Sequence, residues 1–141
     1  MKHYHLIILI FILFYYACGS SRTAITYDEY VQANTIKYRV AEISEAEKLL
    51  LDLIETTKEY QSEGVEGINY DWALSFSYAR LYLIYQRLSN KTASQKYLNK
   101  IKSICHVMGY SPDETKIEIE KLVKFVQDID VQHSVKWINE K

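Results

Sequence analysis

Residues 69–88 read NYDWALSFSYARLYLIYQRL, and their apolar side chains point in nearly every direction around a helix axis. A helix of this kind lies between neighbouring helices, because a helix on the outside of a domain keeps one polar side toward water. We therefore predict a central helix here. The apolar side chains expected to be buried in it are Trp72, Leu74, Phe76, Ala79, Leu81, Leu83, Ile84 and Leu88.

Two helices are expected before this segment. Thr26 with Glu29, and Ser44 with Glu47, have the spacing of a capping box and predict two helix starts. Residues 35–40 contain several β-branched side chains, so the first helix either ends there or continues. The second ends at a loop that contains Gly64 and Gly67, after a stripe with the spacing of a core-facing helix. This stripe consists of Ile43, Ala46, Leu50, Leu53 and Tyr60.

Two further helices are expected after a tight turn at residues 89–91. Gly109 ends the first of them, and Ser111 followed by Pro112 is a strong start signal for the second. Residues 131–138 are expected to extend that last helix, with Trp137 and Ile138 docking the terminus. The sequence thus predicts an all-α domain at residues 26–141, with five to six helices in antiparallel hairpins. The apolar side chains expected to line the two helices are Ala93, Tyr97, Ile101, Ile104, Met108, Ile119, Leu122, Val126 and Ile129.

The stretch from residue 78 to residue 104 resembles a tetratricopeptide-like helical hairpin. The residues that carry the resemblance are Leu81, Tyr85, Leu88, Ser89, Asn90, Ala93, Tyr97 and Ile101. It implies stacked antiparallel hairpins, in a small bundle or an array, and it implies binding of a protein or peptide. The family brings no catalytic residues.

The N-terminus has the pattern of an export signal. Lys2 precedes an apolar run at residues 6–14, and Ala17 and Cys18 follow two tyrosines. An apolar helix needs about 20 residues to span a bilayer, so this run is too short to be a membrane anchor. A positive start, a short apolar run and a small residue before a cleavage site describe a secretory signal at residues 1–17.

The end of this signal resembles that of bacterial lipoprotein precursors, in which a small residue precedes a cysteine that is acylated and becomes the new N-terminus. The resemblance implies that Cys18 anchors the protein in a lipid bilayer, with residues 18–25 as a polar tether. Gly19 is not the Asp that holds such proteins in the inner membrane, so we expect the outer membrane, facing the periplasm. Two alternatives stay open: an ordinary cleaved signal, and an uncleaved tether.

Charge is distributed in blocks. The whole chain has 17 basic and 18 acidic residues, but residues 28–71 contain 11 acidic and 4 basic ones. The charged residues of 72–112 are all basic. They either pair with acidic groups elsewhere in the domain or present a basic face to an acidic partner. The negative net charge and the envelope address argue against nucleic-acid binding. The basic residues of this block are Arg80, Arg87, Lys91, Lys96, Lys100 and Lys102.

Possible partner-binding residues come from this block and from a stripe of tyrosines at helical spacing. The tyrosines either belong to the core or form the floor of a groove. The candidate residues are Tyr78, Tyr82, Tyr85, Arg87, Lys96 and Lys100.

No residue pattern predicts catalysis, a cofactor or a metal ion. Cys105 lies among apolar residues and is expected to be a core thiol, and the neighbouring His106 points about 100° away from it on a helix. His133 has no ligand-like spacing, and Glu114, Glu118 and Lys121 are expected to form a charged helix face.

The expected function is therefore that of a membrane-anchored envelope lipoprotein that binds another envelope protein as a non-catalytic scaffold or assembly module. The alternative is an immunity or exclusion lipoprotein that neutralises a toxin or an invading element.

Overall fold

The computed structural model of the chain describes residues 22–139, which form six α-helices and no strand. This result confirms the all-α class and the expected five to six packed helices. None of these helices is long and apolar enough to cross a membrane. The predicted signal and Cys18 lie outside the described residues. The helices are α2 (Ala24–Val40), α3 (Ile43–Ser62), α4 (Tyr70–Arg87), α5 (Lys91–Val107), α6 (Pro112–Gln132) and α7 (Lys136–Asn139).

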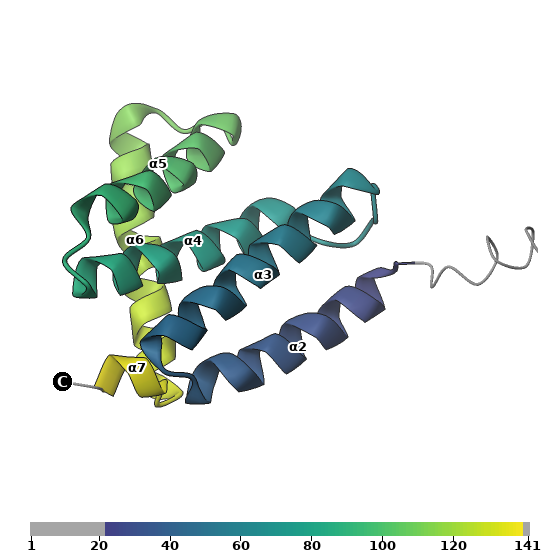
Figure 1. The fold of residues 1–141 in the computed structure, drawn as a ribbon. Helices are drawn as coiled ribbons and strands as arrows, with labels where there is room; N and C mark the ends of the chain where they lie inside the picture. Colours follow the sequence, from purple (N-terminus) through teal and green to yellow (C-terminus); the bar gives the residue numbers. More distant parts are fainter. Residues whose placement is uncertain (1–21, 140–141) are drawn as a thin grey trace, which may run out of the picture.

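The helices form successive antiparallel hairpins around α4. In Figure 1, α2, α3 and α4 lie side by side, α5 returns along α4, and α6 crosses behind both of them. The short α7 then reaches the end of α2. The central position of α4 follows from its apolar sequence, since Leu81, Ile84 and Ala79 are fully buried in it. Trp72 and Leu88, which the sequence predicted to be buried, are instead 55% and 49% exposed, because they lie in the first turn and at the C-cap, where fewer neighbouring helices cover α4.

Helix α2 begins earlier than predicted. Its N-cap is Thr23, whose hydroxyl accepts a hydrogen bond from the Thr26 amide at 3.2 Å, while the Thr26 hydroxyl accepts one from the Thr23 amide at 2.9 Å. The predicted box of Thr26 and Glu29 is therefore wrong, because Thr26 is the third helical residue. The helix starts inside the segment expected as a tether and continues without a break through residues 35–40.

Helix α3 also starts two residues earlier than its predicted capping box allows. Its N-cap is Glu42, which makes no side-chain capping bond, and Ser44 lies inside the helix. The Glu47 carboxylate does not cap this helix, because it accepts a hydrogen bond from the Tyr85 hydroxyl of α4 at 2.5 Å. The predicted apolar stripe is confirmed: Ala46, Leu50, Leu53 and Tyr60 are buried and Ile43 packs against the core.

The turns of the second half follow the sequence closely. Asn90 caps α5, and Gly109 has a φ of 85° directly after the α5 C-cap, a conformation that glycine adopts at little cost. The predicted start of α6 is confirmed: Ser111 is its N-cap and Pro112 lies in its first turn, and the structure adds a capping box between Ser111 and Glu114. After α6 the chain turns at Ser134, so residues 131–138 do not simply extend that helix. Trp137 of α7 docks on the core and is 3% exposed, as predicted.

A buried polar network joins α2, α4, α6 and α7. Asp130 is 1% exposed and accepts hydrogen bonds from Arg80 Nη2 at 2.8 Å and from the Tyr38 hydroxyl at 2.8 Å. The same Tyr38 oxygen accepts a hydrogen bond from Trp137 Nε1 at 2.9 Å, and the Arg80 guanidinium lies 5.0 Å from the Tyr38 ring centre. Arg80, a member of the basic block, thus pairs inside the domain.

Several phenols of this domain should remain protonated at high pH. Burial, and then the Asp130 charge, raise the pKa of Tyr38 far above its usual range, and burial also raises the pKa values of Tyr78 and Tyr97. A pKa that is higher in the folded state gives stability that is complete below the unfolded-state value of about 10 and is lost as the pH rises above it.

We therefore predict that the free energy of unfolding falls steeply as the pH rises above about 10. Denaturant titrations at a series of alkaline pH values measure this slope. Tyr38→Phe should make it shallower, because the variant has lost one group with a raised pKa. An unchanged slope in Tyr38→Phe would contradict this account.

Candidate functional site

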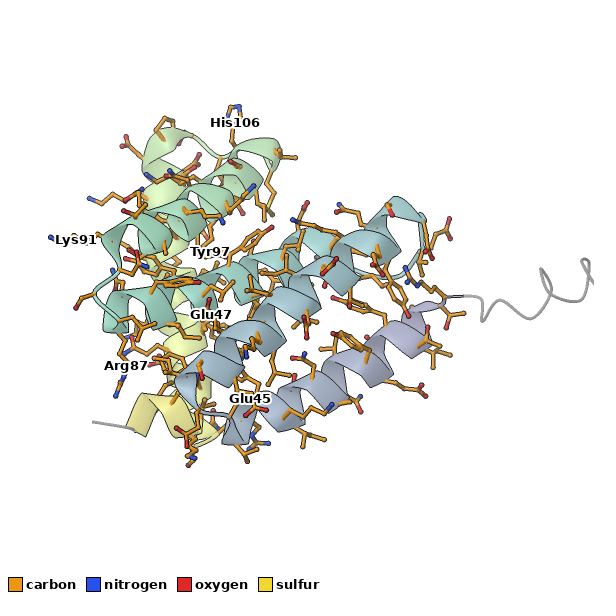
Figure 2. All side chains as sticks on the ribbon, in the orientation of Figure 1. Glu45, Glu47, Arg87, Lys91, Tyr97 and His106 are labelled. Carbon is orange, nitrogen blue, oxygen red and sulfur yellow. The ribbon has the colours of Figure 1, made fainter. Side chains whose placement is uncertain are left out.

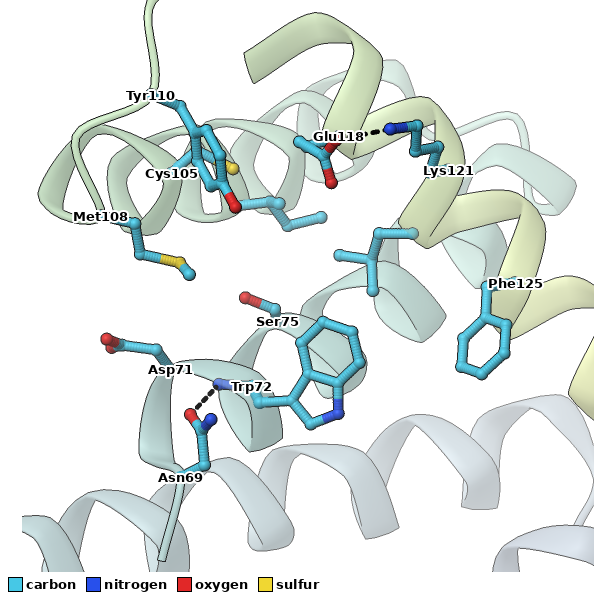
Figure 3. A pocket seen from close by; sticks show the side chains of 12 residues that line it. Asn69, Asp71, Trp72, Ser75, Cys105, Met108, Tyr110, Glu118, Lys121 and Phe125 are labelled. Carbon is cyan, nitrogen blue, oxygen red and sulfur yellow. Dashed lines mark hydrogen bonds and ion pairs between the residues drawn. The ribbon is translucent and has the colours of Figure 1, made fainter. Parts of the chain in front are cut away.

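An apolar cleft of about 390 Å³ opens between the first half of α4, the end of α5 and the middle of α6. Figure 3 shows Trp72 and Phe125 on one side of it, Met108 on another, and Tyr110 and Glu118 above. Trp72 and Met108 are each 55% exposed and Phe125 is 49% exposed. Large apolar side chains that share one concave surface are a common mark of a binding site. The residues that line the apolar cleft are Asn69, Asp71, Trp72, Ser75, Ile101, Cys105, Met108, Tyr110, Glu118, Lys121, Leu122 and Phe125.

The polar groups of the apolar cleft lie mainly at its rim. The Lys121 ammonium is 2.7 Å from the Glu118 carboxylate, and the Asn69 side chain caps α4 by accepting a hydrogen bond from the Trp72 amide at 3.0 Å. Cys105 lies in the wall and is 7% exposed, and burial raises the pKa of its thiol. The prediction of Cys105 as a core thiol is confirmed, and its raised pKa keeps it in the less nucleophilic thiol form.

A second cleft, the basic cleft, lies where α5, the start of α6 and Tyr82 of α4 meet. It has a volume of about 630 Å³, and Lys102, His106 and Lys116 line it together with Glu120. Tyr110 lines both clefts. The basic cleft thus brings one of the predicted binding tyrosines together with one lysine of the basic block.

The predicted tyrosine stripe does not form one exposed groove. Tyr78 is 5% exposed and its ring centre lies 6.0 Å from that of Tyr97, so it belongs to the core. Tyr85 stacks on Tyr97 with ring centres 5.6 Å apart and donates a hydrogen bond to Glu47. Figure 2 shows Tyr97 between α4 and α5. Tyr82, by contrast, lines the basic cleft, and its hydroxyl accepts a hydrogen bond from Gln86.

The predicted basic residues divide into two groups. Arg80 pairs with the buried Asp130, and Arg87 is exposed and donates a hydrogen bond to the Ile138 carbonyl at 3.0 Å. The α5 lysines, by contrast, are all exposed, and none of them forms an ion pair with a carboxylate in the described part of the chain. The α5 lysines are Lys91, Lys96, Lys100 and Lys102.

The histidines and acids considered in the sequence lie apart from each other. His133 Nδ1 is 3.1 Å from Arg39 Nη2 at the end of α6, whereas His106 is exposed at the basic cleft. Glu114 caps α6, and Glu118 pairs with Lys121 on the same helix, as a charged face predicts. Among residues 22–139 no group of three or more His, Cys, Asp or Glu side chains could hold a metal ion.

The apolar cleft is the feature that the sequence did not indicate. The sequence pattern predicts Trp72 and Met108 to face the core, and it predicts no role for Phe125. The sequence contains one signal, because Trp72 and Phe76 are aromatic residues four positions apart on the same helix. In the structure their rings pack edge to face with centres 4.8 Å apart, and Phe76 packs in the same way on Phe125 of α6 at 5.7 Å. Comparison of the chain with protein-family models, with curated protein sequences and with solved structures gives no match.

Proposed function

We propose that this chain is a lipid-anchored protein of the bacterial cell envelope that binds another envelope protein and catalyses no reaction itself. Acylated Cys18 is its anchor, in the outer membrane and facing the periplasm, and the helical domain is its binding module. The observation that carries the binding proposal is the set of exposed α5 lysines without carboxylate partners in the described part of the chain.

Charge and position both support an acidic partner at α5. A helix with four lysines and no acidic residue keeps a local positive field, which steers an acidic protein surface toward it. Helix α5 also lies on the other side of the fold from the start of α2, where the chain emerges from the predicted tether (Figure 1). A lipid at Cys18 would therefore leave α5 accessible to a partner.

Reversing two of these charges tests the binding face. We expect Lys96→Glu with Lys100→Glu to reduce recovery of the partner from solubilised envelopes by about fivefold or more, because an attraction becomes a repulsion. The stability should change little, since substitutions at exposed sites usually stay within about 0.5 kcal/mol each. Affinity capture followed by mass spectrometry, and thermal unfolding, measure the two effects.

The matched control is Lys37→Glu with Lys124→Glu, which reverses two exposed lysines on α2 and α6. This control should recover the partner as well as the wild type does. Equal recovery by the α5 variant, together with a large loss of stability, would mean that the α5 lysines stabilise the domain and are not a binding face.

Cysteine substitution tests the anchor. We expect Cys18→Ser to lose the acyl mass and to move from the membrane fraction to the soluble fraction, because the serine hydroxyl does not replace the acylated thiol. Cys105→Ser is the matched control, since it removes the other cysteine of the chain and should stay membrane-bound. Mass spectrometry and fractionation give the answer. A Cys18→Ser chain that is processed and sediments as before contradicts the lipoprotein proposal.

A further inference from the structure

The apolar cleft has the size and the walls of a small-molecule site. Its volume of about 390 Å³ lies in the range of pockets that hold small ligands, about 300 to 1,000 Å³. Ile101 and Leu122 form its interior with Trp72 and Phe125, and none of the α5 lysines lines it. It is therefore distinct from the face proposed above to bind a protein.

The rim of this cleft favours a positive head group. Two carboxylates, Asp71 and Glu118, line it against one ammonium, that of Lys121, which already pairs with Glu118 at 2.7 Å. Figure 3 shows the Glu118 carboxylate and the Tyr110 hydroxyl directed toward the space above Trp72. Carboxylate and hydroxyl oxygens accept hydrogen bonds from an ammonium group.

The aromatic walls of the apolar cleft also favour a positively charged head group. The faces of Trp72 and Phe125 carry negative partial charge and attract a cation that lies over them, with Trp the best such partner. An anionic head group would be repelled by the carboxylates and by these ring faces, and a neutral head group would be attracted by neither. From this combination we infer that the apolar cleft binds a small organic cation, an apolar or aromatic body that carries an ammonium group.

Three probes with one body separate the contribution of the head group from that of the body. They are 3-phenylpropylamine, 3-phenylpropanol and 3-phenylpropanoate, each titrated calorimetrically into the full-length protein at neutral pH. We expect the amine to bind about threefold to tenfold more tightly than the alcohol, as one partly exposed ion pair together with a cation–π contact allows, and phenylpropanoate to bind most weakly. Bound amine should also slow the alkylation of Cys105, measured on the peptide that contains it, because this thiol lies in the wall.

Variants assign the binding to this cleft. Asp71→Asn with Glu118→Gln should remove the preference for the amine and leave binding of the alcohol unchanged, whereas Trp72→Ala should weaken all three probes. Glu120→Gln is the matched control, because this carboxylate lies on the same helix but lines the basic cleft. The inference is overturned if 3-phenylpropanoate binds as tightly as the amine, if no probe binds at millimolar concentration, or if bound amine leaves Cys105 unprotected from alkylation. Each of these results is independent of Cys18 and of the α5 lysines.

Discussion

Replacing Arg80 by methionine should lower the free energy of unfolding by about 3 to 5 kcal/mol. The reason is the carboxylate that stays behind. Asp130 is 1% exposed, and Arg80 gives it hydrogen bonds from both Nε and Nη2, at 3.1 Å and 2.8 Å. Without the guanidinium, Tyr38 is the one side chain among residues 22–139 that still donates a hydrogen bond to this buried carboxylate. Urea denaturation of the purified variant measures the loss.

A second substitution distinguishes the uncompensated charge from a simple loss of packing. Arg80→Met with Asp130→Leu removes both charges and should be more stable than Arg80→Met alone, since an apolar pair can replace a buried ion pair at little cost. Arg39→Met is the matched control, because Arg39 is exposed and contacts only His133 among the partners described. If the double variant lost as much stability relative to the wild type as Arg80→Met and Asp130→Leu lose together when measured singly, the pair would not be coupled.

The substitution Trp137→Ala should cost a similar amount, about 3 to 5 kcal/mol. Trp137 is 3% exposed in the four-residue helix α7, and its indole donates to Tyr38 at 2.9 Å. The variant leaves a large cavity between α7 and the rest of the core, and it removes one partner of the polar network. We expect α7 to detach before the remaining helices unfold, because so short a helix has no stability of its own.

The other tryptophan is the natural control. Trp72 is 55% exposed and packs edge to face on Phe76, so Trp72→Ala should cost at most about 1.5 kcal/mol. Denaturant titrations compare the two variants, and hydrogen exchange reports whether α7 opens separately. A loss for Trp137→Ala as small as the one expected for Trp72→Ala would show that docking of α7 contributes little to the stability of the fold.

Local signals allowed much of the helix pattern to be predicted, but they do not choose between competing starts. The start signal at Ser111 and Pro112 predicted the beginning of α6 correctly, because Ser111 caps the helix and Pro112 restricts the backbone in its first turn. The boxes expected at Thr26 and Ser44 were wrong. Thr23 offers an equivalent hydroxyl three residues before the first, and Glu47 of the second bonds to a residue of another helix. The spacing of Ser44 and Glu47 within one segment contains no information about a hydrogen-bond partner such as Tyr85, which lies 38 residues further along the chain.

The same limit applies to the polar core and to the clefts. Asp130 follows Val126 by four residues and so lies on the buried side of α6, which is a signal that the sequence contained. Its partners, however, are 50 and 92 residues away, and nothing local indicates which basic residue turns inward. The apolar cleft depends in the same way on where α4, α5 and α6 cross.

The long separations in the polar network also constrain how the protein can be made. The Tyr38 hydroxyl makes its hydrogen bonds with Asp130 and Trp137, which follow it by 92 and 99 residues in the chain. A ribosome delivers a chain from its N-terminus, so Tyr38 of α2 cannot make these two hydrogen bonds until residue 137 has been synthesised. During that interval the part of α2 that packs against α7 stays uncovered, so the core around Tyr38 depends on the last helix of the chain.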